Sequence, residues 1–154
     1  MRAVAALPLG LAVMACGALM SDTDQRLCAV GQKLSAAITV VHEAMIEKQS
    51  GNPAGAATLT EAGRAEAEDA EALLESMSAD DLETSRAFER LVSASSMTLQ
   101  ATTLMMPEFS DTLGVALDLA GAIGALAKAD ASLPVACLIA APPPMPDFPE
   151  RRSQ

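Results

Sequence analysis

The strongest constraint on this chain is the spacing of its apolar residues. In the stretch that follows Ser21 they recur at steps of three and four, which places their side chains on one face of an α-helix. These residues are Leu27, Val30, Leu34, Ile38, Val41 and Met45. A half-buried strand would require apolar and polar residues to alternate instead. The spacing therefore predicts a helix that runs to about Lys48.

Three further helices are predicted between residues that break or cap helices. The segment 50–55 is expected to be a loop because it contains Gly, Asn and Pro. Thr58 and Glu61 have capping-box spacing, so the second helix should begin there and end near Met77. Capping residues at 78–83 precede a third helix, which Pro107 ends, with an apolar stripe at Phe88, Val92, Leu99 and Met106. A fourth helix follows Ser110 or Asp111 and ends near Pro134, with a stripe at Leu113, Leu117, Ala120, Ile123 and Ala127.

These segments predict an all-α protein, an antiparallel four-helix bundle with up-down-up-down topology, because short connections join the helices. Hydrophobic residues make up 51% of the chain and aromatic residues only 2%, which suits a helical core better than a β-sandwich. We expect the bundle domain at 21–141. The proline-rich stretch 142–154 should be a disordered C-terminal tail.

Two features of the later helices are unusual for a bundle. Ser95 and Thr102 share the third stripe, so their hydroxyl groups should bond back to helix carbonyls or lie in a less buried seam. The fourth helix is apolar almost all round, and Asp118 is the only charged residue between Leu113 and Leu126. Such a helix either fills the centre of the bundle or contacts a membrane or a partner.

The first 15 residues have the layout of a bacterial export signal, with a basic start at Arg2 and an uncharged stretch up to Ala15. The sequence Val13-Met14-Ala15-Cys16 resembles a bacterial lipobox over these four residues. The resemblance implies that Cys16 becomes the first residue of the mature chain and receives a diacylglycerol.

Two other interpretations of this segment remain open. Cleavage after Ala15 without lipidation would give a secreted protein. Retention of the uncharged stretch Ala3–Met20 would give an uncleaved anchor near the minimum length of about 18 residues for a membrane span. All three interpretations place the domain outside the cytoplasm, in the periplasm or the cell envelope.

The cysteine count is consistent with export. If Cys16 is lipidated, Cys28 and Cys137 remain as an even pair for an oxidising compartment. In an up-down-up-down bundle the two would lie at the same end. They are 109 residues apart, for which the chain-entropy model gives a stabilisation of about 4–5 kcal/mol. We therefore expect a disulfide; the alternative is a pair of small buried thiols.

Charge and residue types exclude several function classes. The net charge of −10 repels phosphate backbones, so nucleic acid is not an expected partner. His42 is the only histidine and no G-x-S-x-G motif is present, so neither a hydrolytic triad nor a transition-metal site is expected. His42 should lie on a partly exposed helix face, and Glu61, Glu68 and Glu75 on a solvated one. No enzyme activity and no cofactor are predicted.

The expected function follows from these points. We expect an exported, lipid-anchored small helical protein with a non-catalytic binding or structural role in the bacterial cell envelope. Its partners would be the lipid bilayer, through the acyl group on Cys16, and an envelope protein. The alternative is a soluble periplasmic carrier that binds a small apolar ligand or a metal in the bundle core.

Overall fold

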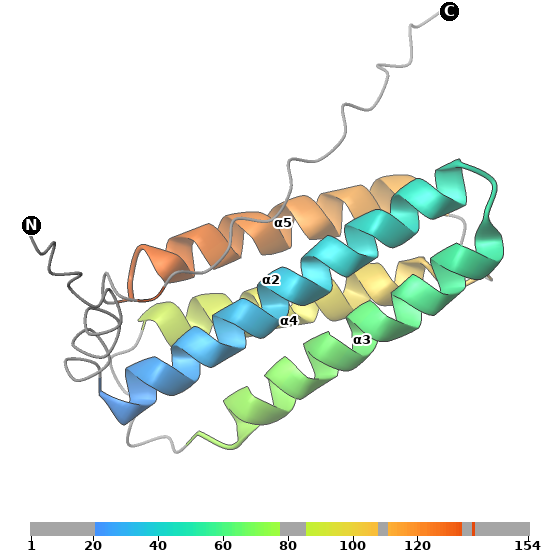
Figure 1. Ribbon diagram of the computed structural model, residues 1–154. Helices are drawn as coiled ribbons and strands as arrows, with labels where there is room; N and C mark the ends of the chain where they lie inside the picture. The colour runs from blue at the N-terminus through green and yellow to red at the C-terminus, as the bar shows by residue number, and fades with distance from the viewer. Residues whose placement is uncertain (1–20, 78–85, 108–110, 134–136, 138–154) are drawn as a thin grey trace, which may run out of the picture.

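The computed structural model describes residues 21–77, 86–107, 111–133 and 137. Within these ranges it contains four helices and no strand: α2 (Asp22–Gln49), α3 (Pro53–Glu75), α4 (Arg86–Leu104) and α5 (Thr112–Asp130). The predicted all-α class is confirmed (Figure 1). The expected signal peptide 1–15, Cys16, the caps at 78–83 and the tail 142–154 lie outside the described residues.

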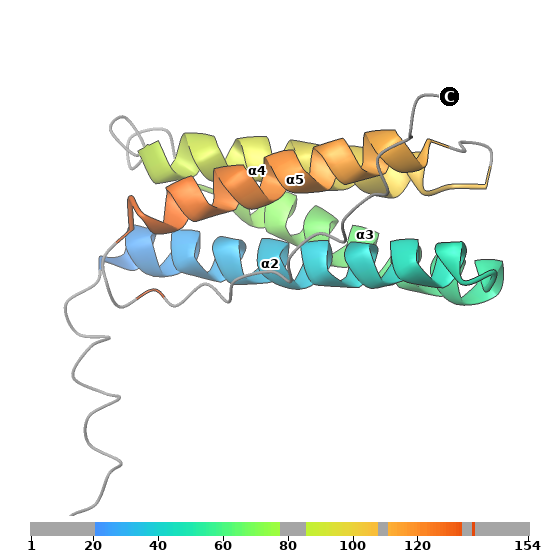
Figure 2. The same ribbon diagram turned by 90° about the horizontal axis from the view of Figure 1, so that it is seen from above.

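The four helices pack side by side along their length (Figure 1 and Figure 2). α2 packs mainly against α3, and α4 packs mainly against α5. α3 also contacts α4, and α2 also contacts α4 and α5. α3 and α5 therefore lie diagonally opposite each other across the bundle, and this separation gives the molecule two different sides.

The predicted stripe of α2 is confirmed, because all six of its apolar residues are buried in the core. The start of α3 differs from the prediction. Asn52 caps this helix, since its Oδ1 accepts a hydrogen bond from the Gly55 N–H at 3.1 Å, and Pro53 fills the first helical position, where no N–H is needed. The capping box predicted at Thr58 and Glu61 is therefore wrong, and both residues lie inside α3.

The predicted stripes of α4 and α5 are also wrong in part. On α4, Val92 is 43% exposed, whereas Leu91, Ala94 and Thr98 face the core. On α5, Leu113 and Leu117 face outward, and the buried residues are Val115, Ala116, Leu119, Ala122, Ala125, Leu126 and Ala129. α5 has apolar or small residues on nearly every face, and on α4 the apolar Val92 lies among the exposed polar residues, so the spacing of apolar residues alone did not identify the inner faces. For Thr102 the first of the two alternatives is confirmed: it is buried, and its hydroxyl donates to the Leu99 carbonyl at 2.7 Å.

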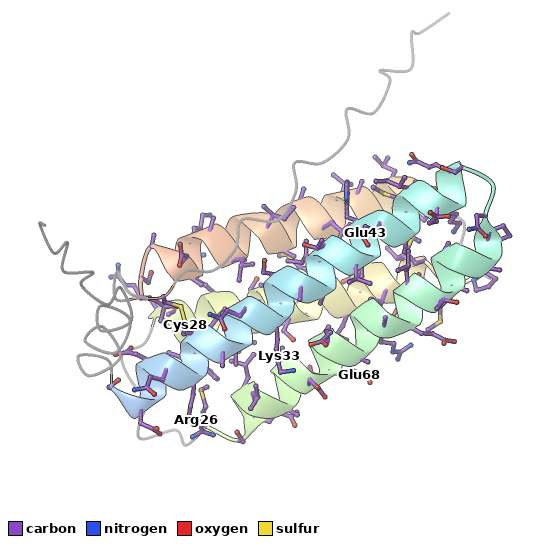
Figure 3. The ribbon with its side chains drawn as sticks, viewed as in Figure 1. Arg26, Cys28, Lys33, Glu43 and Glu68 are labelled. Carbon is purple, nitrogen blue, oxygen red and sulfur yellow. A yellow bond between two sulfur atoms is a disulfide. The ribbon has the colours of Figure 1, made fainter. Side chains whose placement is uncertain are left out.

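The expected cysteine pair comes together at one end of the bundle. The Sγ atoms of Cys28 and Cys137 lie 2.08 Å apart, a disulfide distance, and Figure 3 shows the bond beside the start of α2. Cys137 follows α5 along the chain, so the bond joins the beginning of α2 to the segment just beyond α5.

Close approach of α2 and α3 depends on small residues on the inner face of α3. Gly63 is buried there with Ala67 and Ala70. A Cβ added at Gly63 would lie 2.7 Å from Val41 Cγ2 and 3.3 Å from the Ala37 carbonyl oxygen. No larger side chain fits at this position without moving α2.

We expect Gly63→Ala to lower the free energy of unfolding by about 1–3 kcal/mol, because the new methyl group overlaps the stiff Val41 side chain. Gly124→Ala is the matched control: nothing lies within 4 Å of a Cβ built there. Alanine should stabilise that exposed helical position by about 0.5–1 kcal/mol. Urea unfolding of both variants tests the pair, and equal effects would contradict the close α2–α3 contact.

Candidate functional site

The first candidate surface is the outward face of α5, defined by five uncharged, exposed residues: Leu113, Leu117, Ala120, Gly124 and Ala127. Their spacing of four and three places them in one line along the helix. Leu113 is 64% exposed and Leu117 is 65% exposed, so two large apolar side chains lie in solvent at one end of this line. Exposed large apolar side chains in a continuous row are typical of a contact surface.

α5 is also the one helix in the described ranges that is long and apolar enough to cross a membrane, and 33% of its apolar stretch is buried inside the bundle. The helix is therefore not the fully covered centre of the bundle. Asp118 lies within the same helix, and an intramembrane carboxylate is costly. These properties suit contact with an apolar surface better than insertion through one.

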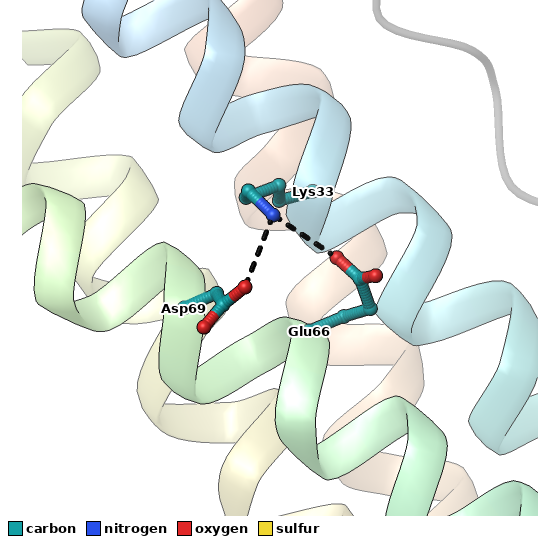
Figure 4. A network of polar contacts seen from close by, with 3 residues as sticks. All are labelled: Lys33, Glu66 and Asp69. Carbon is teal, nitrogen blue, oxygen red and sulfur yellow. Dashed lines mark hydrogen bonds and ion pairs between the residues drawn. The ribbon is translucent and has the colours of Figure 1, made fainter.

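The opposite side of the bundle is charged. Lys33 of α2 forms ion pairs with Glu66 and Asp69 of α3, each at 3.3 Å (Figure 4). The hydrogen bond to Asp69, followed by the one to Glu66, raises the pKa of Lys33 above its ordinary value. Arg64 and Glu68 form a further pair along α3 at 2.8 Å. The predicted solvated face is confirmed, since Glu61, Glu68 and Glu75 are all exposed.

The second candidate site is a cavity of about 380 Å³ where the last turn of α2, the first turns of α3 and the end of α4 meet. Its apolar wall consists of Pro53, Ala56, Ala57, Met105, Met106 and Pro107. Lys48, Glu61 and Arg64 also line it. Cys28 lies near the start of α2 and Lys48 in its last turn, so the cavity and the disulfide occupy opposite ends of the bundle.

Three buried polar atoms in the described ranges have no hydrogen-bond partner: His42 Nε2, Ser95 Oγ and Asp118 Oδ2. His42 is only 8% exposed, so the expectation of a partly exposed histidine is wrong. It lies on the same face as the apolar stripe of α2, between Val41 and Met45, and the packed bundle covers it. Desolvation, and to a smaller extent the charge of Asp111, raises the pKa of Asp118 above its ordinary value.

Of the residues singled out from the sequence as site residues, Cys28 and Cys137 are brought together, and Cys16 lies outside the described ranges. In those ranges no group of three or more His, Cys, Asp or Glu side chains is placed to hold a metal ion. The cavity was missed, because Lys48 of α2, Arg64 of α3 and Met105, just after α4, are far apart in the sequence and share no motif. The only indication of the outward α5 face in the sequence was the apolar character of the whole helix.

No protein-family model matches this chain, and neither a curated protein nor a solved structure matches it.

The raised pKa of Asp118 predicts a pH-dependent stability. The folded state binds the proton more tightly than the unfolded state, so the free energy of unfolding falls as the pH rises from the ordinary carboxyl pKa through the raised one. We expect Asp118→Asn, which removes the charge and keeps the shape, to raise Tm near pH 7. This gain should shrink as the pH falls toward the ordinary carboxyl pKa of about 4, because the wild-type carboxyl then takes up a proton.

Thermal melts at both pH values measure this difference. Glu71→Gln is the matched control, since it removes one negative charge from an exposed position on α3. A similar rise in Tm for both variants would mean that only the total charge matters, and would contradict a specific cost at Asp118.

Proposed function

We propose that this protein is an exported, lipid-anchored, non-catalytic protein of the bacterial cell envelope, and that the outward face of α5 lies against the bilayer surface. The observation that supports the proposal is the row of exposed uncharged residues on α5, which includes Leu113 and Leu117. The structural role is to hold this helical domain at the membrane. An envelope protein that covers the same face is the alternative partner.

The domain in this proposal is an up-down-up-down bundle. Two observations support that topology: α2 packs mainly on α3 and α4 on α5, and the connections are short. The disulfide provides a third, because it requires the start of α2 and the end of α5 to be neighbours.

The short tether supports contact with the bilayer. Residues 17–21 alone separate Cys16 from α2, which begins at Asp22. At full extension they reach about 20 Å, so an acyl group on Cys16 would hold the bundle next to the lipid headgroups. The disulfide brings the end of α5 to the same end of the bundle. An anchored domain would thus have the last turn of α5 next to the interface, and Leu113 and Leu117, in the first turns of α5, would reach the bilayer when the bundle lies flat on it.

The chemistry of the α5 face suits a neutral lipid interface. Burial of Leu113 and Leu117 would contribute about 1–2 kcal/mol each, and the exposed Lys128 in the last turn can direct its ammonium group toward water or phosphate. The net charge of −10 opposes binding to strongly anionic lipid. We therefore expect α5 to lie in the interface rather than to span the membrane.

Lipidation is tested by the intact mass of the chain expressed with its own leader in a bacterial host. We expect a mature protein that begins at Cys16, with added lipid mass and a deficit of two hydrogens that reduction restores. Cys16→Ala is the control and should lose the lipid mass. An unmodified chain cut after Ala15 would indicate a secreted protein, and a full-length chain would indicate an uncleaved anchor; either result would refute the lipoprotein proposal.

The orientation of α5 is tested with a fluorescent reporter, because the chain has no Trp of its own. Leu117→Trp should show blue-shifted emission and quenching by nitroxide-labelled lipids when the anchored protein is reconstituted in phosphatidylcholine vesicles. Ile46→Trp is the matched control, since Ile46 is an exposed apolar residue of α2 at 43%. It should retain the emission of a water-exposed indole.

Equal emission from the two reporters would refute contact between α5 and the bilayer. A blue shift at Leu117→Trp in cell envelopes without quenching by the labelled lipids would assign the α5 face to a protein partner instead.

A second candidate function is favoured by the end cavity. We propose, as the alternative, that the protein is a carrier of a small apolar ligand. The cavity and its wall of Ala, Pro and Met side chains support this, although it lies at the end of the bundle and not in the core. The metal-carrier version has no support in the described ranges, where no suitable ligand group occurs.

A further inference from the structure

The end cavity concentrates positive charge in an acidic protein. Two of the ten Lys and Arg residues of the chain, Lys48 and Arg64, line it, against one carboxylate, Glu61. The lining residues carry one positive charge more than negative, whereas the whole chain has a net charge of −10. Glu68, outside the lining, pairs with Arg64 at 2.8 Å, so Lys48 supplies the unpaired positive charge. An anionic group is attracted here and repelled over most of the remaining surface.

The two cations differ in how free they are to bind. Within the described ranges, Lys48 has no hydrogen bond or ion pair through its side chain, and it is only partly exposed. Arg64 donates from Nε to Glu68, which leaves its two terminal nitrogens available for a second acceptor. The Thr60 hydroxyl donates to the Ala56 carbonyl at 2.7 Å, so it is not free to donate to a ligand.

The apolar wall is suited to an alkyl chain. Ala56 and Met105 are buried at the inner side of the cavity, and Met106 is partly buried beside them. Methionine side chains are flexible and adapt to irregular apolar ligands. The volume of about 380 Å³ lies at the small end of the range for small-molecule sites, which suits one short chain and not a two-chain phospholipid.

We propose that this cavity binds a small single-chain amphiphile with one anionic group, for which a medium-chain carboxylate is the simplest example. The anionic group would lie between Lys48 and Arg64, and the chain would pack against Ala56, Met105 and Met106. This inference depends on the proposed carrier function and adds the chemical class of the ligand. The cavity lining includes no residue of α5, so the site is separate from the bilayer-facing surface.

The test compares decanoate with decanol, which has the same chain length and no charge, below their micelle concentrations. Isothermal titration with the full protein should show tighter binding of decanoate. Lys48→Gln should weaken decanoate binding about tenfold and leave decanol binding unchanged, because it removes one charge-assisted contact. Glu61→Gln should strengthen decanoate binding, since it removes the one carboxylate of the lining.

Two further variants define the site. Lys128→Gln is the matched control, because Lys128 and Lys48 each lie in the last turn of a helix and Lys128 is outside the cavity. It should bind decanoate as the wild type does. Ala57→Phe places a ring at an exposed lining position and should abolish binding of both probes. Its melting temperature without ligand reports whether the bundle remains folded.

The outcomes separate the two proposals. Equal binding of decanol and decanoate would overturn the anionic class and leave the carrier function standing. No binding of either probe would overturn both. Decanoate binding that persists in a folded Ala57→Phe variant would place the ligand elsewhere and overturn the assignment of this cavity.

Discussion

A core with almost no aromatic side chains has to be closed by bringing helices near one another, and this constraint shapes the bundle. The chain has no Trp or Tyr, and many of its buried residues are alanines. Alanine contributes little apolar area unless the facing helix is close. α3 meets the constraint most directly, since Gly63 lets its backbone approach Val41 and Ala37 of α2. The larger side chains of α2 then fill the centre.

The same constraint explains which parts of the fold were predictable. On α2, large apolar residues and polar residues alternate with helical spacing, so the inner face could be identified from the sequence. On α4 and α5, the inner face mixes large residues such as Leu91 and Leu119 with small ones such as Ala94 and Ala122, while Val92 and Leu117 lie outside. Residue size therefore did not identify the buried face there. The cap at Asn52 was missed because a second, better-known capping pattern follows it within α3.

The candidate sites also differ in how far the sequence could predict them. The cysteine pair was predictable because parity and topology both point to it. The end cavity was not, because it depends on how far three helices extend beyond one another, and local spacing along a single helix contains no information about that. The uncharged α5 face and the cavity nevertheless lie on different parts of the bundle. The uncharged face belongs to α5, and the cavity is lined by α2, α3 and the residues just after α4, so contact at one leaves the other accessible.

The disulfide restrains only one end of the bundle. At that end, the beginning of α2 and the segment after α5 are covalently joined, so these two segments cannot separate even when local packing is lost. At the far end, where α2 turns into α3 at Gly51 and α4 reaches Pro107, packing and hydrogen bonds alone hold the helices together. Local opening is therefore easier at the far end. The cavity lies at this far end and already opens to solvent at Pro53, Ala57 and Glu61, so its walls belong to the part of the bundle that no covalent bond restrains.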